Sequence, residues 1–485
     1  MLTVRKKRKK IIRDPSRVIT RLHLPKSMAH ARRIIKRVLK LNQTQVVEVL
    51  RSVYDEFSDR HRDIDDILLK NYNAIAYLLP ETSTELDIDR KKLLGAYFTM
   101  EYAVESAAIF NPSIVLHPHQ EGLAQGQVRF IMSLRAVGEG HISSIEFRSG
   151  IIDDDINIIF DPINEFVERA ELQLNPLYDR HLFELKLNEM QVCNETTAEI
   201  LSALSEQFTF SSLQKSISDF EKNHHQLTHA QENTISTILW LARSNYELKF
   251  NPDSMISERV IFPASENDQS GIEDARFVRF VDDDGDAVYY ATYTAYNGSE
   301  ILPQLIQTCD FLTFKIITLN GKAVQNKGMA LFPRRIQGKY VMLSRQDNEN
   351  NHIMFSDHLH FWQKSEILQR PSYPWEFVQI GNCGSPLETS AGWLVLTHGV
   401  GPMRKYCISA ILLDLENPRK LIGVLSEPLL EPRGEEREGY VPNVVYTCGA
   451  MIHNQQLIIP YAMSDTMAGI ATVPVKDVLA AIKKS

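Results

Sequence analysis

The stretch GDAVYYATYTA, residues 285–295, places a turn-forming glycine before a run of β-branched and aromatic residues. Such a run after a tight turn is typical of a β-strand. The same arrangement recurs four times: GQVRFIMSLRA at 126–136, GKYVMLSRQ at 338–346, GWLVLTHGV at 392–400 and NQQLIIPYAMSD at 454–465. Each run is followed, after a short polar gap, by a second apolar run. The sequence therefore predicts five repeated antiparallel units.

Repeated β-units of this size indicate a propeller, because each small sheet needs neighbours to bury its two faces. We predict a mainly β fold, a five-bladed β-propeller that occupies residues 106–485. An irregular β-sandwich whose hairpins resemble one another by accident is the alternative that this pattern leaves open.

Two parts of the chain show the helical period of apolar residues instead. The first is N-terminal, where residues 31–57 read ARRIIKRVLKLNQTQVVEVLRSVYDEF. We interpret residues 1–105 as a basic helical N-terminal extension. The second covers about 185–250, and we interpret it as a helical hairpin inserted into the β domain.

The charge is divided unevenly along the chain. Residues 1–40 hold 15 of the 53 Lys and Arg and one acid, Asp14, so this segment carries +14 and the remainder −22. Such a basic arm either docks on acidic parts of its own chain or of a second subunit, or it binds an external polyanion or anionic membrane. A homo-oligomer and an anionic partner for the arm are both expectations of this kind.

The composition is that of a folded protein that does not cross a membrane. With 485 residues and 44% hydrophobic content, the chain can bury a large core, and no apolar run reaches the ~18 residues of a membrane helix. The basic start is not followed by the apolar stretch of a secretory signal. The five cysteines are scattered, which argues against a disulfide framework. We therefore expect a cytoplasmic protein.

Polar residues end several of the apolar runs: Arg135, Arg345, His398 and Asp465. In a propeller the ends of the inner strands meet at one face. A polar cluster drawn from separate segments would form a single pocket there, with Asp274 of the stretch GIEDARF entering from the second unit.

Eight motifs, in this order along the chain, resemble the blade motifs of one known family. They are NPSIV, LRAVGEG, GIEDARF, KGMALFPRRIQGKYVMLSR, SDHLHFW, GNCGSPLETSAGWLVLTHGV, AILLDLENP and VPNVVYTCGAMIHNQQLIIPYAMSD. The family is glycoside hydrolase family 130, the five-bladed β-mannoside phosphorylases and related β-mannosidases. The resemblance covers about residues 110–475 and leaves out the N-terminal region and the insertion.

The resemblance implies roles for individual residues. The family's Glu-Asp-Pro-Arg loop matches Glu273, Asp274, Ala275 and Arg276. Asp274 then becomes the general acid, which in the family is thought to protonate the glycosidic oxygen through a sugar hydroxyl. Asn111, Arg135 and Asp465 match positions that hold the mannose at the cleaved end, and Glu273 and Arg276 are grouped with them as substrate-binding residues.

Phosphate attack needs fixed positive charge near the anomeric carbon. Lys327 and Arg345 match basic positions of the family's anion site, with His398 beside them, and Arg404 and Lys405 are further candidates for phosphate binding. Where many phosphorylases have a lysine, this chain has Glu388, which would repel phosphate or act as the base that activates water.

The resulting hypothesis is an enzyme that cleaves β-mannosides by inverting phosphorolysis and releases α-mannose 1-phosphate. An inverting β-mannosidase that uses water is the alternative enzyme, and a non-catalytic glycan-binding propeller is the alternative from another class. Inorganic phosphate is expected as co-substrate, and we expect no metal and no organic cofactor.

Overall fold

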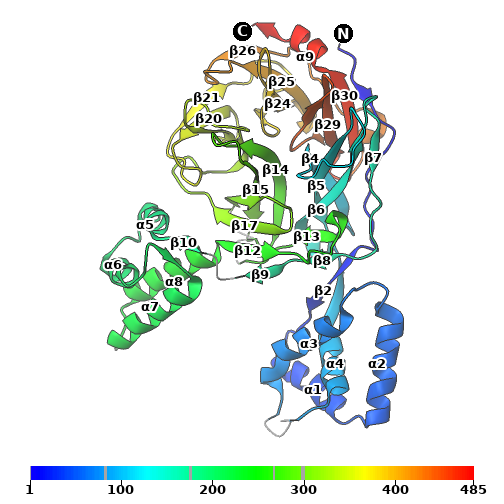
Figure 1. Ribbon diagram of the computed structural model, residues 1–485, viewed down its shortest axis with the longest axis vertical. Coiled ribbons are helices and arrows are strands. Elements are labelled where there is room, and N and C mark those ends of the chain that lie inside the picture. The colour runs from blue at the N-terminus through cyan, green and yellow to red at the C-terminus, as the bar shows by residue number, and fades with distance from the viewer. Residues whose placement is uncertain are drawn as a thin grey trace.

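The computed structural model describes residues 2–80, 85–173, 177–224, 226–265, 268–296 and 301–484. The fold is mainly β, as predicted, and two groups of helices project from the β body (Figure 1). In the described residues, no helix is long and apolar enough to cross a bilayer.

The β body consists of five sheets of four to six strands, which follow one another along the chain. The first contains β4 (Ala108–Leu116), β5 (Val128–Val137), β6 (Ser143–Ile152), β13 (Arg259–Ile261) and β8 (Glu168–Arg169), with β7 (Ile158–Phe160) beside β6. The second contains β14 (Gly271–Val281), β15 (Ala287–Tyr296), β16 (Ile301–Thr308), β17 (Thr313–Thr318), β12 (Tyr246–Lys249) and β9 (Glu171–Gln173).

The third sheet contains β18 (Lys327–Leu331), β19 (Tyr340–Arg345), β20 (Asn351–Ser356) and β21 (Ser365–Gln369). The fourth contains β22 (Gln379–Asn382), β24 (Gly392–Val400), β25 (Tyr406–Leu413), β26 (Leu421–Val424) and β31 (Lys483–Lys484), with β23 (Leu387–Thr389) beside β24. The fifth contains β27 (Val445–Tyr446), β29 (Gln456–Met463), β30 (Met467–Pro474) and β1 (Arg5–Lys6), with β28 (Met451–His453) beside β29.

The repeat seen in the sequence is the second strand of each sheet: β5, β15, β19, β24 and β29. In each sheet one strand, here called the first strand, precedes this run. The first strands β4, β14, β18, β22 and β27 are shorter or interrupted by bulges, which hides their alternation in the sequence.

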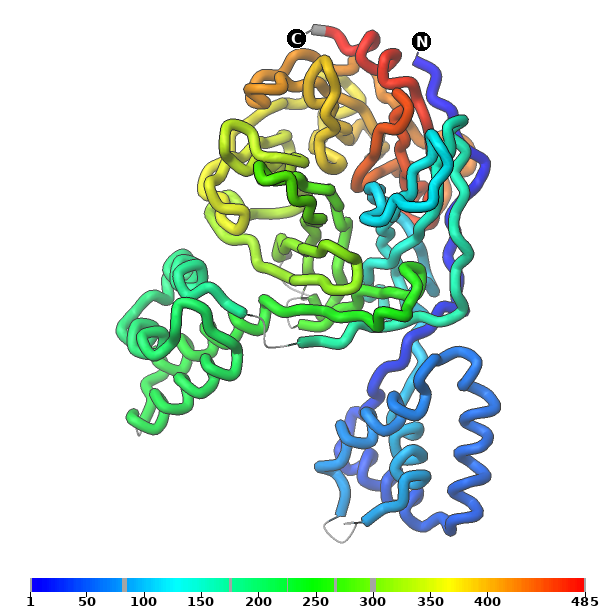
Figure 2. The backbone as a smooth tube through the Cα atoms, in the orientation of Figure 1, coloured from blue at the N-terminus to red at the C-terminus, as the bar shows by residue number. Residues whose placement is uncertain are grey.

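Five apolar clusters fill the spaces between consecutive sheets. Because side chains alternate along a strand, β24 supplies Leu394 and Leu396 to the cluster shared with the fifth sheet, and Trp393 and Val395 to the cluster shared with the third. The last cluster joins the fifth sheet to the first, with Ile458 of β29 beside Ile109 of β4. Figure 2 shows the two ends of the β body lying side by side at this junction.

The N-terminal region contains the predicted helices, but it does not begin with one. Helices α1 (Met28–Leu39), α2 (Gln43–Phe57), α3 (Ile64–Ile75) and α4 (Ile88–Tyr97) form a group that is joined to the body through the paired strands β2 (Val18–Leu22) and β3 (Thr99–Ala103). The interpretation of residues 1–105 as a helical extension is corrected for residues 5–22, which are largely extended.

The extended arm docks on the body of its own chain. Strand β1 pairs antiparallel with β30, and Ile11 forms a bridge to Ala468. The Lys6 ammonium lies 2.6 Å from a Glu436 carboxylate oxygen, and the Lys10 ammonium lies 3.0 Å from a Glu435 oxygen. Of the two expectations for the basic arm, docking on acidic parts of its own chain is the one that holds for this segment. The basic residues of α1 remain exposed.

The insertion is a four-helix unit and not the predicted hairpin. It contains α5 (Arg180–Glu189), α6 (Glu195–Ser202), α7 (Phe210–Asn223) and α8 (His229–Arg243), beside the short pair β10 (Tyr178–Asp179) and β11 (Gln207–Phe208). These helices bury their own apolar cluster. The buried Lys186 ammonium of α5 donates to the carbonyl and hydroxyl oxygens of Thr318, which fastens the unit to the second sheet. A last helix, α9 (Val475–Ala481), follows the fifth sheet.

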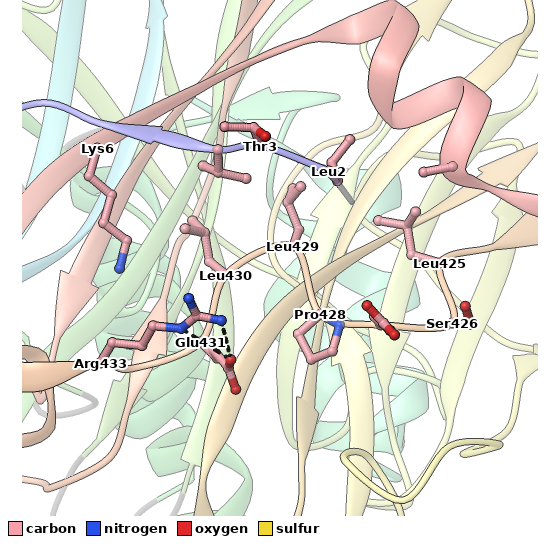
Figure 3. A pocket seen from close by; sticks show the side chains of 13 residues that line it. Leu2, Thr3, Lys6, Leu425, Ser426, Pro428, Leu429, Leu430, Glu431 and Arg433 are labelled. Carbon is pink, nitrogen blue, oxygen red and sulfur yellow. Dashed lines mark hydrogen bonds and ion pairs between the residues drawn. The ribbon is translucent and has the colours of Figure 1, made fainter.

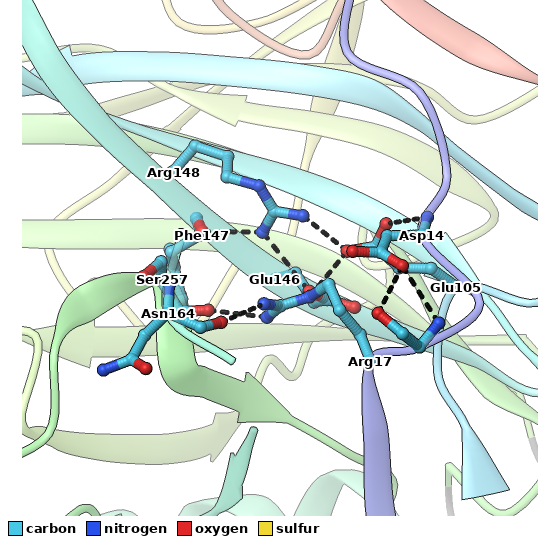
Figure 4. Close-up of polar contacts among 9 residues, drawn as sticks. Asp14, Arg17, Glu105, Glu146, Phe147, Arg148, Asn164 and Ser257 are labelled. Carbon is cyan, nitrogen blue, oxygen red and sulfur yellow. Dashed lines mark hydrogen bonds and ion pairs between the residues drawn. The ribbon is translucent and has the colours of Figure 1, made fainter. Parts of the chain in front are cut away.

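A buried ion cluster ties the arm to the first sheet (Figure 4). The Arg17 guanidinium lies 2.9 Å from carboxylate oxygens of both Glu105 and Glu146, and Arg148 contacts the same two carboxylates. All four side chains are buried. Charges removed from water are tolerated only when they are paired, so each member of the cluster depends on the others.

We predict that Arg17→Ala lowers the free energy of unfolding by about 3–5 kcal/mol, because Glu105 and Glu146 then lose a buried partner. The matched control is Lys10→Ala, which removes an exposed pair and is expected to cost less than about 1 kcal/mol. Urea denaturation of the two variants measures both values. Equal, small losses would contradict the role assigned to the buried cluster.

Candidate active site

Two residues of the site, buried Asn111 and partly buried Asp274, lie on bulges in neighbouring first strands. The register of β4 shifts between Phe110 and Ser113, and that of β14 shifts between Glu273 and Arg276. Within these bulges Asn111 has φ 48° and Asp274 has φ 56°. Asn and Asp tolerate this left-handed region better than other side chains, and such strained positions cluster at functional sites. The Asn111 amide nitrogen donates to an Asp274 carboxylate oxygen at 2.6 Å.

Cations from two other strands surround this carboxylate. An Arg135 guanidinium nitrogen lies 2.8 Å from a Glu273 oxygen, and another lies 3.7 Å from an Asp274 oxygen. The Lys327 ammonium lies 2.8 Å from the second Glu273 oxygen. Glu273 is therefore held between Arg135 of the first sheet and Lys327 of the third. The structure brings together these predicted residues from three sheets.

Arg276 lies beneath Asp274 and is turned inward. Its guanidinium donates to the Cys383 carbonyl at 3.1 Å, to the Tyr446 hydroxyl at 2.7 Å and to the Asp274 carbonyl at 3.2 Å. The side chain is buried, and these bonds connect the second, fourth and fifth sheets. These bonds support the Asp274 bulge, and a contact between Arg276 and the sugar stays a prediction.

The two aspartates of the cluster have opposite acidities. Burial would raise the pKa of Asp274, but the charges of Arg135, Arg276 and Lys327 and the Asn111 hydrogen bond hold that pKa below its ordinary value. Burial and the Asp274 carboxylate raise the pKa of Asp465 to about 6. Asp465 has φ 51° in the turn between β29 and β30. Such divergence within one cluster is a mark of functional sites.

A second group lies beside the first and combines a cation with neutral donors. Arg345 is the register partner of Lys327, and its guanidinium lies 3.1 Å from Nε2 of His398. Burial and the charges of Arg345 and Arg276 hold the pKa of His398 well below its ordinary value, so the imidazole is neutral at neutral pH. It supplies a hydrogen bond and no charge.

Several buried polar atoms near Arg345 and His398 have no hydrogen-bond partner within the described residues. Nε of Arg345 and both polar side-chain atoms of Asn382 are buried and lack a hydrogen-bond partner within the described ranges. Buried polar atoms are normally bonded, so this group suits an oxygen-rich ligand. The Tyr446 ring contacts His398 with centroids 5.0 Å apart, while its hydroxyl accepts from Arg276, which links the two groups.

Sequence reasoning missed Tyr446, Asn382 and Gln379 as members of the site. The Gln379 side chain lies within reach of Nε2 of His398. Tyr446 and Asn382 stand inside motifs that carry the family resemblance, but an apolar-looking run gives no sign that a tyrosine hydroxyl is turned toward a buried arginine. All three residues lie in first strands, β22 or β27, so recognising these strands in the sequence would have pointed to them.

Arg404 and Lys405 diverge from each other. Arg404 has φ 55° in the turn between β24 and β25, and its charge acts on Asp465. The Lys405 ammonium lies 3.0 Å from Glu431, which lines a groove between the N-terminal residues and residues 425–433 (Figure 3). Among the described residues, neither Lys405 nor any other predicted site residue lines this groove. The Lys405 charge is paired with Glu431, and its role in phosphate binding stays a prediction.

Comparison with known proteins agrees with this geometry. A family model described as beta-1,4-mannooligosaccharide phosphorylase, glycoside hydrolase family 130, matches residues 215–484. The chain belongs to glycoside hydrolase family 130.

Curated relatives within the family match nearly half of the chain. A 1,2-beta-oligomannan phosphorylase of Thermoanaerobacter is 34% identical over 229 residues, which are 46% of this chain and 75% of that protein. A beta-1,4-mannooligosaccharide phosphorylase of Ruminococcus albus is 31% identical over 48% of this chain and 72% of its own length. The solved beta-1,2-mannobiose phosphorylase of Listeria innocua is 20% identical, with a TM-score of 0.45 over 79% of this chain and 93% of that one.

Glu388 does not lie in this family-130 site. Its carboxylate is bonded to both ends of the Arg334 guanidinium at 2.9 Å. It lines a cavity together with Leu116 and Val281, the last residues of β4 and β14. Asp274 stands near the other end of β14, and seven residues of strand correspond to about 20 Å. Glu388 is therefore at the opposite ends of the first strands, and the prediction that it opposes phosphate or activates water is wrong.

We predict that Glu388→Gln leaves kcat/KM for β-mannobiose within about twofold of the parent value, because only an exposed ion pair is lost. The matched control is Glu366→Gln, which removes the similarly exposed pair with Arg419. Steady-state kinetics of both variants measures the effect. A loss of tenfold or more that is confined to Glu388→Gln would return this carboxylate to the reaction.

Proposed function

We propose that this chain cleaves β-mannosides by inverting phosphorolysis and releases α-mannose 1-phosphate. The observation that carries the proposal is the Asp274 carboxylate among Arg135, Lys327 and Asn111, with Arg345 and neutral His398 beside it. The named activities of the curated relatives support the same reaction class.

The residues divide between holding the sugar and holding the anion. Asn111, Arg135 and Asp465 hold the mannose at the cleaved end, since charged and amide groups give oriented hydrogen bonds to hydroxyls. Glu273 keeps Arg135 and Lys327 in position. Arg345, with Lys327 and Arg404 nearby, holds inorganic phosphate, and His398 donates or accepts a hydrogen bond there.

In the reaction, a phosphate oxygen attacks the anomeric carbon and forms the new C–O bond from the opposite face. The bond from that carbon to the leaving oxygen breaks, and Asp274 supplies the proton that the leaving oxygen needs, through a sugar hydroxyl. Asp274 has a low pKa in the free protein. A bound dianion offsets the surrounding positive charge, which raises the pKa of Asp274 and prepares it to donate.

We also propose that the five sheets are the blades of a five-bladed propeller. The apolar clusters support this arrangement, because each lies between two consecutive sheets and one lies between the last and the first. In such an arrangement the bulges of β4, β14 and β18 face one central pocket.

The choice between phosphate and water depends on which groups surround the anion. Glu388 was the sequence argument for a hydrolase, and it is bonded to Arg334 at the far end of the first strands. Glu273, close to the site, is bonded to two cations and is a poor base. Arg345 contacts neutral groups and is free to bind a dianion, which favours phosphorolysis.

We predict that the protein forms mannose 1-phosphate from β-1,2- or β-1,4-mannobiose only when inorganic phosphate is present. The reaction is run in buffer with a chelator, because we propose that phosphate is the only co-substrate and that no metal is needed. Chromatographic product analysis with and without phosphate measures the outcome. Free mannose released at one rate under both conditions would identify a hydrolase instead.

Two variants assign the roles. Arg345→Ala should raise KM for phosphate at least about tenfold, because one charge-assisted contact is lost. Asp274→Asn should lower kcat by at least about 10²-fold while the protein still binds mannobiose, since only the proton is removed. A nearly parental kcat of the Asp274→Asn variant would show that Asp274 is not the general acid. The absence of any mannobiose binding by the parent would favour an unrelated glycan-binding role.

We propose in addition that the chain forms a homo-oligomer through α1. Its exposed face carries Arg32, Arg33, Lys36 and Arg37 on a chain whose remainder is acidic. The double variant Arg33→Glu/Lys36→Glu should then have a lower mass by light scattering than the parent. A parent with the mass of one chain would count against self-association and favour an external anionic partner for this face.

A further inference from the structure

Two large side chains in loops beside the site, Tyr440 and Met403, are exposed to solvent. The Tyr440 side chain is 65% exposed and the Met403 side chain is 91% exposed. An exposed apolar surface at the edge of a polar pocket is a place where a ligand can bind. Both residues belong to loops next to Asp465.

The loop of Tyr440 is fastened to the turn that carries Asp465. The Tyr440 backbone nitrogen donates to the Thr466 hydroxyl at 2.9 Å, and the Val441 nitrogen donates to the Ser464 carbonyl at 3.1 Å. Ser464 and Thr466 are the two neighbours of Asp465 in the chain. The backbone of Tyr440 is therefore held beside Asp465.

A second ring comes from the first sheet. His141 stands in the turn between β5 and β6, just beyond Arg135, and its ring centroid lies 5.8 Å from that of Tyr440, with the planes inclined by 32°. This turn is held by a hydrogen bond from the Tyr102 hydroxyl to the Glu139 carbonyl at 2.8 Å. The two rings thus form a small aromatic surface next to the segments that carry Arg135 and Asp465.

Met403 approaches from the fourth sheet. It precedes Arg404, whose charge acts on Asp465, and it has φ 59° in a turn closed by a hydrogen bond from Gly401 nitrogen to the Lys405 carbonyl at 3.0 Å. The left-handed backbone at Met403, like that at His141 with φ 62°, is uncommon for such side chains. Strain retained in the turns beside a site is a sign of function.

We propose that Tyr440 and His141 bind the sugar unit on the leaving side of the cleaved bond. This inference rests on the proposed function. A pyranose ring has an apolar face of C–H groups that packs on an aromatic surface, while its edge hydroxyls remain in water. Such a surface accepts a sugar with little demand on hydroxyl orientation. Tyr440 and His141 therefore determine which acceptors are used, whereas the buried cluster selects mannose.

The test measures synthesis from α-mannose 1-phosphate and D-mannose or β-1,2-mannobiose as acceptor. Tyr440→Ala should raise KM for the acceptor at least about fivefold and leave KM for mannose 1-phosphate within twofold of the parent value. Tyr440→Phe, which keeps the ring, should restore the parental KM. The matched control is Tyr77→Ala, because Tyr77 is 63% exposed on the N-terminal helices and should change neither constant.

A binding measurement separates this inference from the proposed reaction. Calorimetric titration of the Asp274→Asn protein should show that Tyr440→Ala weakens β-1,2-mannobiose binding and leaves mannose binding unchanged, whether the parent uses phosphate or water. Three results would overturn the inference that Tyr440 and His141 bind the leaving-side sugar. The first is unchanged mannobiose binding, and the second is an equal loss of mannose and mannobiose binding, which indicates damage to the site around Asp274. The third is a lower mass of Tyr440→Ala by light scattering, which indicates that a second copy of the chain covers these residues.

Discussion

The largely enclosed carboxylate of Asp274, 17% exposed, is the constraint on which the site depends. A charge in this position is tolerated only if partners reach it from several directions, and one sheet cannot supply them all. Asn111 and Arg135 come from the first sheet, and Lys327 comes from the third. Arg276, which lies in the same strand as Asp274, is held by groups of the fourth and fifth sheets. The site therefore forms only when the five sheets are packed together.

The bulges in the first strands orient Asn111 and Asp274 so that these partners can reach the Asp274 carboxylate. A regular first strand would point Asn111 and Asp274 along the alternating faces of its sheet, toward the apolar clusters between sheets. The extra residue and the positive φ at each bulge turn these side chains to the strand end instead, where cations from neighbouring sheets converge. The strain is the cost of placing polar groups where the packing pattern would put apolar ones.

Much of the fold could be predicted, because the second strands alternate cleanly and share their turns. The arm was misjudged because its pairing partner β30 lies more than 400 residues away, and local periodicity carries no information about such a contact. The insertion could have been divided correctly from its sequence, since Asn194, Thr209 and Thr228 each cap a new helix.

The site shows the same division. Residues that end a recognised run, such as Arg135 and Arg345, could be found from position alone. Glu388 could not, because it stands ten residues from His398 in the sequence, and β23 and β24 form a hairpin that carries it toward the far end of the sheet. Tyr446 was missed because burial and a hydrogen bond from Arg276 decide its role, and Asn382 because burial decides its role; a local pattern reports neither.

The central claim is that the bulged first strands join a sugar site at Asp274 to an anion site at Arg345. A crystal structure of the protein soaked with mannose and inorganic phosphate tests it most directly. We expect phosphate within hydrogen-bond distance of the Arg345 guanidinium, and mannose bonded to Asn111 and Asp465 with its anomeric carbon facing the phosphate. Phosphate bound at the Arg334–Glu388 end of the first strands, or mannose bound away from Asp274, would rule out this arrangement.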